Sequence, residues 1–265
     1  MRRVSERNRY FTFGDGIYMK TIVNWKTFLI LLVACGVSSV LVIPYQAGLN
    51  PALSELGAML YLGAFLQGTI IFSIVTFLGL ILARKTGFSL PILEDNKKLE
   101  TLKSIAGPSI LWGLIGGILI TLLAFLFGNI SLELFAVELA VPTWARFLAI
   151  FYGGIAEEVL LRLFVMSFFV WVLMKTKLPK KASIWVAIII SAVLFGLGHL
   201  PITGELTAIT TAVVFRAILL NGVVAIIFSL LYWKKGLESA MIAHFFTGIV
   251  LRFITPLMAS WFISI

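Results

Sequence analysis

Charged residues and cysteine are scarce in this chain. Only 12% of its 265 residues are charged, 60% are hydrophobic, and the mean hydropathy is +1.07. Soluble domains average about 25% charged and about 45–50% apolar residues, so a soluble globular protein is excluded. The single cysteine, Cys35, excludes an intrachain disulfide. The sequence also lacks the H-E-x-x-H, Walker, G-x-S-x-G and dinucleotide-binding motifs, which leaves the common catalytic signatures unrepresented.

Long apolar runs are abundant instead. A helix needs about 20 apolar residues to cross a bilayer. We predict an all-α fold, a polytopic transmembrane helical bundle of eight spans, or seven if the last segment lies on the membrane surface. No internal repeat or linker divides the chain, so we expect one membrane domain at 27–265 after a basic segment at 1–26. The predicted spans are 27–43, 56–82, 110–127, 144–174, 182–200, 207–233, 238–251 and 253–265.

The beginning of the chain also has some features of a signal peptide, because a basic segment precedes an apolar run. The tetrad from Leu32 to Cys35 is similar to a lipoprotein cleavage box. The sequence from Gly36 to Ile43 stays largely apolar, however, so the run is long enough to cross a membrane and we predict an uncleaved first span.

The basic residues lie on one side of the predicted spans. Of the 21 Lys and Arg residues, the segments 1–26, 84–103, 175–181 and 234–235 hold six, five, four and two, whereas the loops 44–55, 128–143 and 201–205 hold none. The positive-inside rule therefore predicts a multi-pass protein of the cell membrane with a cytoplasmic N-terminus. The same rule and anionic lipids account for the net charge of +9, so we expect membrane lipids as partners and no nucleic acid.

Several ionisable groups remain at or inside predicted spans. A charge near the bilayer centre costs at least about 2.5–3.5 kcal/mol, so such groups indicate either a functional site or an ion-paired structural network between helices. The polar residues concerned are Arg146, Glu157, Glu158, Arg162, His199, Arg216, Asn221, His244 and Arg252.

Adjacent positions assign Glu157 and Glu158 different roles, because neighbours on a helix point about 100° apart. Glu158 precedes Arg162 by four residues, the favourable spacing for an ion pair. Glu157 is then the less compensated carboxylate and the better candidate for a general base. Counted from the basic loops, Glu158 and His199 lie at similar depth, whereas His244 is expected to lie closer to the membrane surface.

Three motifs together resemble a known family. The segment Glu157-Glu158-Val159-Leu160-Leu161-Arg162 fits E-E-x-x-x-R, Phe195 to His199 fits F-x-x-x-H, and His244 supplies the histidine of a third motif. In this order, over 144–251, they resemble the CPBP family of intramembrane glutamate proteases, also called the Abi family, which includes CAAX proteases and bacteriocin-processing enzymes. The resemblance implies a helical membrane protein that hydrolyses peptide bonds without a metal or other cofactor.

The resemblance also implies roles for individual residues. Glu157 with His199 would activate water, His244 would stabilise the oxyanion, and Glu158 with Arg162 would support the site. The substrate would be a membrane-associated peptide or a lipid-modified protein. The sequence does not indicate the oligomeric state.

The third motif of this family reads H-x-x-x-N or H-x-x-x-D, and here its last position is Gly248. Loss of an oxyanion donor typically lowers the rate by about 10²–10³-fold. Thr247 or Asn221 would then have to supply the donor, or the chain is inactive. An Asn in place of Gly248 is expected to put an amide beside His244, because the two positions lie one turn apart on a helix.

Four functions remain after these observations. An intramembrane endopeptidase is the leading hypothesis, and a zinc peptidase with Glu157, His199 and His244 as ligands is a second. A non-catalytic membrane scaffold or bacteriocin-immunity protein that keeps the protease fold is the third, and Gly248 is the feature that favours it. A transporter with a proton relay is the weakest, because the sequence shows no repeated halves.

Overall fold

The computed structural model of the chain describes residues 10–13, 17–20 and 23–263. Arg2, Arg3, Arg7 and Arg9 of the predicted basic segment lie outside the described residues. Within that segment, strands β1 (Tyr10–Phe13) and β2 (Ile17–Lys20) pair in an antiparallel hairpin, which the sequence analysis did not predict. The other elements of the described chain are helices, as expected.

The first half of the chain contains three long helices joined by shorter ones. The Asn24 side chain accepts hydrogen bonds from the backbone N–H groups of Lys26 and Thr27 and so begins the first helix, and Gly87, with a φ of 84°, ends the second long one. The helices are α1 (Trp25–Leu41), α2 (Ile43–Leu49), the 3₁₀ helix η1 (Pro51–Leu56), α3 (Ala58–Thr86), α4 (Pro91–Glu94), α5 (Lys98–Phe125) and α6 (Asn129–Ala140).

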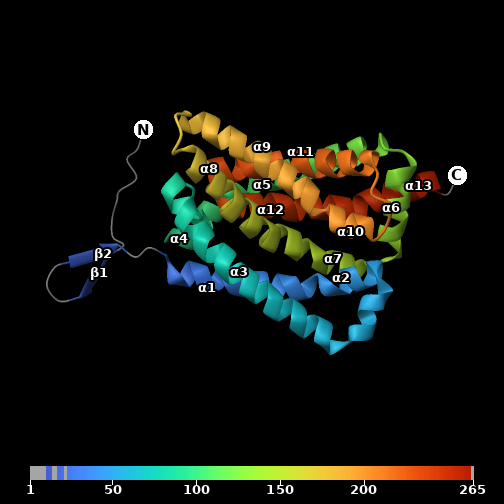
Figure 1. The fold of residues 1–265 in the computed structure, drawn as a ribbon, viewed down its shortest axis with the longest axis horizontal. Coiled ribbons are helices and arrows are strands. Elements are labelled where there is room, and N and C mark those ends of the chain that lie inside the picture. Colours follow the sequence, from blue (N-terminus) through green and yellow to red (C-terminus); the bar gives the residue numbers. More distant parts are fainter. Residues whose placement is uncertain (1–9, 14–16, 21–22, 264–265) are drawn as a thin grey trace.

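The second half begins with a continuous helical segment at 143–173 that contains π-helical turns. Such turns are rare and frequently occur at functional sites. Figure 1 shows this segment, from α7 to α8, crossing the molecule between α1 and α3 on one side and α9 and α11 on the other. The elements are α7 (Thr143–Phe151), the π-helical η2 (Tyr152–Glu157) and η3 (Val159–Met166), α8 (Ser167–Leu173), α9 (Lys180–Gly198), α10 (Leu200–Gly204), α11 (Thr211–Lys235), α12 (Leu237–Ile249), the π-helical η4 (Val250–Ile254) and α13 (Thr255–Ile263).

The described residues contain six helical segments that are long and apolar enough to cross a membrane. A multi-pass helical protein is therefore confirmed, but the expected count of seven or eight spans is not. The segment at 143–173, which carries both glutamates, is not among the six. The six are Trp25–Leu49, Ala58–Thr86, Lys98–Phe125, Lys180–Gly204, Thr211–Lys235 and Leu237–Ser260.

Two sequence predictions near the end of the bundle are wrong, and both errors involve Arg252. The predicted spans 238–251 and 253–265 form one continuous helical segment through α12, η4 and α13 in the described chain. The predicted polar loop at 128–143 is largely helix α6. Arg252 Nη1 lies 3.0 Å from Glu138 Oε1, and the Tyr45 hydroxyl donates to the other oxygen of the same carboxylate. Because these two charges neutralise each other, neither needs a solvent-exposed loop.

Close backbone contacts hold together the helices of the second half of the chain and join them to α5. A Cβ atom on Gly113 would lie 2.3 Å from the Ala243 carbonyl oxygen, so α5 and α12 meet with no side chain between them. A Cβ atom on Gly196 would lie 2.5 Å from Ile218 Cα, so α9 and α11 meet in the same way. A 2.6 Å hydrogen bond between two hydroxyls adds to the α5–α12 contact, from Ser109 and Ser239.

The outer face of α3 carries a row of large apolar side chains that no other part of the described chain covers. Exposed apolar side chains of this kind are costly in water but favourable in lipid. This surface therefore contacts membrane lipids, as the composition predicts. The row comprises Leu62, Phe65, Leu66, Ile70 and Ile74.

Candidate active site

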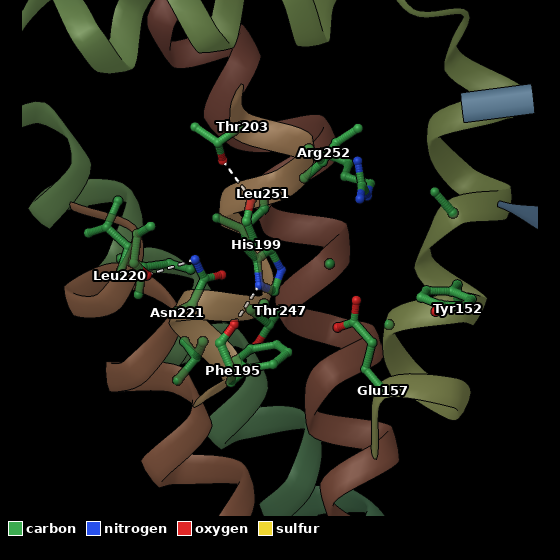
Figure 2. A pocket seen from close by; sticks show the side chains of 18 of the residues that line it. Tyr152, Glu157, Phe195, His199, Thr203, Leu220, Asn221, Thr247, Leu251 and Arg252 are labelled. Atoms are coloured by element: carbon green, nitrogen blue, oxygen red, sulfur yellow. Dashed lines mark hydrogen bonds between the residues drawn. The ribbon is translucent and has the colours of Figure 1, made fainter. Parts of the chain in front are cut away.

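A cavity of about 740 Å³ lies between the 143–173 segment, α9, α11 and α12. Glu157, His199 and His244 all line it, although they are far apart in the sequence. Figure 2 shows the Glu157 carboxylate and the His199 imidazole reaching into this space from different helices. The structure therefore brings the three residues that the sequence analysis selected as catalytic to one place. Asn221, Thr247 and Gly248 also line this cavity.

Glu158 and Arg162 form the ion pair that their spacing predicts. Both side chains are fully buried, and Arg162 Nη1 lies 3.1 Å from Glu158 Oε1. Arg162 Nη2 also donates a 3.3 Å hydrogen bond to the Ala225 carbonyl oxygen of α11. Glu157, by contrast, faces the cavity with 22% of its side chain exposed. The two glutamates therefore have different surroundings, as their positions on the helix predicted.

The His244 imidazole lies between these two glutamates. Its Nδ1 is 2.7 Å from Glu158 Oε1, and its Nε2 is 3.7 Å from Glu157 Oε2. The Phe228 ring stacks on the imidazole with a centroid distance of 4.6 Å and an interplanar angle of 19°. A Cβ atom on Gly153 would lie 2.9 Å from Nε2, so the absence of a side chain there permits the close approach of α12.

The expectation that His244 lies closer to the membrane surface than Glu158 is wrong, since the two side chains are in contact. The turn between α11 and α12 explains the error. Leu237 is fully buried, its N–H donates to the Ser89 carbonyl oxygen, and the Glu238 carboxylate accepts a hydrogen bond from the Leu93 N–H. Helix α12 thus begins inside the protein, and a count of residues from the basic loop underestimates the distance from His244 to the surface.

His199 is the first residue after α9, and its ring is held by its own helix. The Nδ1 atom lies 2.8 Å from the Phe195 carbonyl oxygen. Because a carbonyl oxygen can only accept, Nδ1 donates, and in the neutral ring Nε2 is the acceptor. No direct contact within 4 Å joins His199 to Glu157 in the described structure.

Thr247 and Asn221, the two candidate replacements for the missing oxyanion donor, differ in the hydrogen-bond donors that they leave available. Thr247 is buried, and its hydroxyl donates a 2.8 Å hydrogen bond to the Gly113 carbonyl oxygen, so it serves the contact between α12 and α5. Asn221 Nδ2 donates one hydrogen to the Ala217 carbonyl oxygen at 2.9 Å and retains a second. Figure 2 shows the Asn221 amide at the cavity beside His199. Of the two, Asn221 has the available donor.

Gly248 lies against the neighbouring helix. A Cβ atom on Gly248 would be 2.9 Å from Ile150 Cγ2 and 3.3 Å from Ile150 Cγ1. A side chain at this position therefore starts against Ile150 of α7. An Asn side chain at position 248 can therefore reach His244, as expected from the sequence, only if Ile150 moves.

The zinc hypothesis needs Glu157, His199 and His244 to converge on one ion. Among the residues that the structure describes, no group of three or more His, Cys, Asp or Glu side chains is arranged to hold a metal ion. The donors of a tetrahedral zinc site, each about 2.0–2.2 Å from the metal, would lie about 3.3–3.6 Å apart. Glu157 and His199 do not meet that condition. The residues as arranged do not fit a zinc site.

Residues 139–250 match the family model of type II CAAX prenyl endopeptidase Rce1-like proteins. The match confirms the resemblance to the CPBP family, and it covers nearly the range that the motifs indicated. It includes Glu157, Glu158, Arg162, His199 and His244. The match supports an endopeptidase at the level of the family, and the six long apolar helices of the described chain support a multi-pass membrane protein. None of the curated proteins and none of the solved structures matches the chain.

Within the Rce1-like segment, sequence reasoning missed the aromatic support of the buried ion pair. The Arg162 guanidinium lies over the rings of Phe195 and Phe228, with Cζ 4.9 and 5.3 Å from their centroids. One signal was available for Phe228, because it follows Asn221 by seven residues and so lies on the same face of the helix two turns away.

Proposed function

We propose that this chain is an intramembrane endopeptidase that hydrolyses a peptide bond of a membrane-associated or lipid-modified protein. The observation that carries the proposal is the convergence of Glu157, His199 and His244 on one cavity inside a segment that matches a CAAX endopeptidase family. A structural ion-pair network would need only Glu158 and Arg162. It would not require a partly exposed carboxylate and a second histidine at a cavity wall.

Water activation is assigned to Glu157 and His199. Both groups line the same cavity without direct contact, and the mechanism places one water molecule between the carboxylate and His199 Nε2. Glu157 takes a proton from this water as the oxygen attacks the peptide carbonyl, and His199 orients the water by accepting its second hydrogen. Glu157 then returns the proton to the leaving amine, which completes hydrolysis.

Oxyanion stabilisation is assigned to His244 and Asn221. The Glu158 carboxylate accepts a hydrogen bond from Nδ1 and so fixes the orientation of the His244 ring; in the proposed mechanism the imidazolium form of this ring donates Nε2–H to the tetrahedral oxygen. The second hydrogen of the Asn221 amide takes the place of the family's third-motif amide, which Gly248 lacks. A preorganised donor of this kind contributes about 10²–10³ in rate.

The packing of α9 on α11 supports the choice of Asn221. Gly196 lies beside Ile218, so these two residues mark one level of the antiparallel pair. The His199 ring turns back toward Phe195, and the Asn221 amide turns back toward Ala217. His199 follows Gly196 by three residues, and Asn221 follows Ile218 by three. Because each side chain points back along its own helix toward the Gly196–Ile218 contact, both polar groups reach the cavity at similar depth.

The decisive experiment uses the full-length protein in lipid vesicles and a prenylated peptide, with products identified by mass spectrometry. We expect cleavage by the wild type, and loss of at least about 10³-fold in the Glu157→Gln and His199→Ala variants. Cleavage should persist in a strong chelator. Inhibition by the chelator with recovery on zinc addition would establish the zinc mechanism instead. No cleavage by folded wild type of any peptide in a broad panel would favour a non-catalytic scaffold.

A further inference from the structure

Arg216 is a cationic residue of the cavity wall that the proposed mechanism does not use. It lies in the first half of α11, and its Nε donates a 2.8 Å hydrogen bond to Ser131 Oγ of α6. Ser131 is fully buried, so this bond fixes the guanidinium stem against the protein. The guanidinium has four other N–H donors, and it lines the cavity.

No carboxylate in the described part of the chain pairs with Arg216. The other cavity arginine, Arg252, is neutralised by Glu138 at 3.0 Å, and its guanidinium lies 4.0 Å from the centroid of the Tyr45 ring. The remaining acid of the cavity wall, Glu157, lies near His244 and makes no ion pair with Arg216. The cavity wall therefore holds one carboxylate for chemistry and, separately, one arginine with no acidic partner among the residues described.

An unpaired arginine within a membrane span is costly, which makes a bound anion a favourable partner. Arginine also suits one anion in particular, because its planar fork of N–H groups matches a carboxylate with two parallel hydrogen bonds. A peptide that enters the cavity brings one carboxylate at a defined place, its C-terminus. CAAX sequences are themselves C-terminal, so the family match makes this end of the substrate the relevant one.

Arg216 lies apart from the proposed reacting groups. It is five residues from Asn221 on one helix, which corresponds to about 7.5 Å along the axis and about 140° around it. Its hydrogen bond to Ser131 places it toward α6, which lies at one end of the bundle (Figure 1). A substrate end bound at Arg216 is therefore separated from the scissile bond by part of the cavity.

We propose that Arg216 binds the C-terminal carboxylate of the peptide substrate and thereby sets the distance from that end to the bond that is cleaved. Ser131 is the positioning residue that holds the guanidinium. This inference rests on the proposed peptidase function and adds to it a specificity determinant outside the reacting groups.

The test compares a prenylated peptide of about ten residues in two forms, with a free C-terminal carboxylate and with a C-terminal amide. Wild-type protein in phosphatidylcholine vesicles should cleave the acid with a KM at least about tenfold lower than the amide, with a smaller difference in kcat. Arg216→Gln should raise the KM for the acid to that for the amide. Arg216→Lys should keep part of the preference, because it keeps the charge but loses the fork.

The matched control is Lys181→Gln, which removes an exposed charge at the end of α9 opposite His199 and should leave the preference intact. Inserting one residue before the C-terminus of the acid peptide should move the cleaved bond by one residue, as read by product mass. Equal KM values for acid and amide in the wild type would overturn the inference even if no Arg216 variant folds. A preference that survives Arg216→Gln would overturn it as well.

Three further outcomes separate this inference from lipid binding by Arg216 and from the proposed peptidase function. If Arg216→Gln weakens cleavage of acid and amide equally, and only in vesicles that contain phosphatidylglycerol, the guanidinium binds a lipid phosphate and the inference is wrong. If the wild type cleaves neither peptide form, the proposed peptidase function fails first. If it cleaves both forms equally well, the peptidase function stands and only the role of Arg216 fails.

Discussion

His244 Nδ1 lies 2.7 Å from Glu158 Oε1, the same carboxylate oxygen that contacts Arg162 Nη1 at 3.1 Å. One buried oxygen thus links α12 to the 143–173 segment that carries both glutamates. Any change at Glu158 alters both the charge balance around Arg162 and the orientation of His244. The supporting residues and the proposed oxyanion donor are therefore energetically coupled.

Glu158→Gln should destabilise the protein, because Arg162 then remains buried without a negative partner. Breaking a buried pair costs about 3–5 kcal/mol, so we expect a lower yield and a Tm several degrees lower in detergent. The folded fraction should also lose activity, since the Gln amide holds His244 less firmly. Glu157→Gln should keep the wild-type Tm while abolishing cleavage.

The exposed pair of Lys97 and Glu100 supplies the control for this comparison. Their side chains are 71% and 72% exposed, and surface pairs of this kind contribute about 0–1 kcal/mol. Glu100→Gln should therefore leave both the Tm and the activity unchanged. Equal Tm values for Glu158→Gln and Glu100→Gln would contradict a structural role for the buried pair.

Gly153→Ala should displace the His244 ring, because the new methyl group would lie 2.9 Å from Nε2. Small displacements of a positioned catalytic group cost up to about 10²-fold in rate, so we expect kcat to fall about 10–100-fold while the protein still folds. Gly63→Ala is the matched control, since no atom lies within 4 Å of a Cβ atom at that position. Similar kcat values for the two variants would show that the His244 ring position does not limit catalysis.

Gly248→Asn should not raise the activity on its own, because its Cβ atom would lie 2.9 Å from Ile150 Cγ2. Combined with Ile150→Ala, the Asn gains room to approach His244. The double variant should then show a kcat about tenfold above that of Ile150→Ala alone, since a new donor acts chiefly in the transition state. No difference between these two variants would support Asn221 as a sufficient oxyanion donor.

The orientation in the membrane remains a prediction from the charge distribution, and single-cysteine labelling tests it. The natural Cys35 is fully buried, so it gives a low background. Leu178→Cys, at a position that is 43% exposed between α8 and α9, should be labelled only from the cytoplasmic side. Leu126→Cys, at a 77% exposed position, should be labelled from the opposite side. Labelling of residue 178 from outside intact cells would reverse the orientation.

The sequence predicted the helical class and the contact between Glu158 and Arg162, because both depend on local signals. Apolar runs indicate spans, and the four-residue spacing of Glu158 and Arg162 produces a contact on any helix. The depth of His244 could not be predicted, since it depends on how the α11–α12 turn packs beneath the Ser89 and Leu93 backbone. The continuous α12–α13 segment was missed for a related reason. An arginine in an apolar segment suggests a membrane boundary unless it has an acidic partner. The partner of Arg252 is Glu138, which is distant in the sequence and could not be identified from it.

The cavity residues come from helices that emerge from the ribosome at different times. Glu157 is synthesised first, His199 follows, and His244 is added only after α11 is complete. A growing chain that has inserted α9 but not α12 therefore holds its proposed general base without the histidine between its two glutamates. Before α11 is added, Arg162 also lacks the Phe228 ring. The proposed site is thus complete only late in biogenesis, when α12 docks against the rest of the protein.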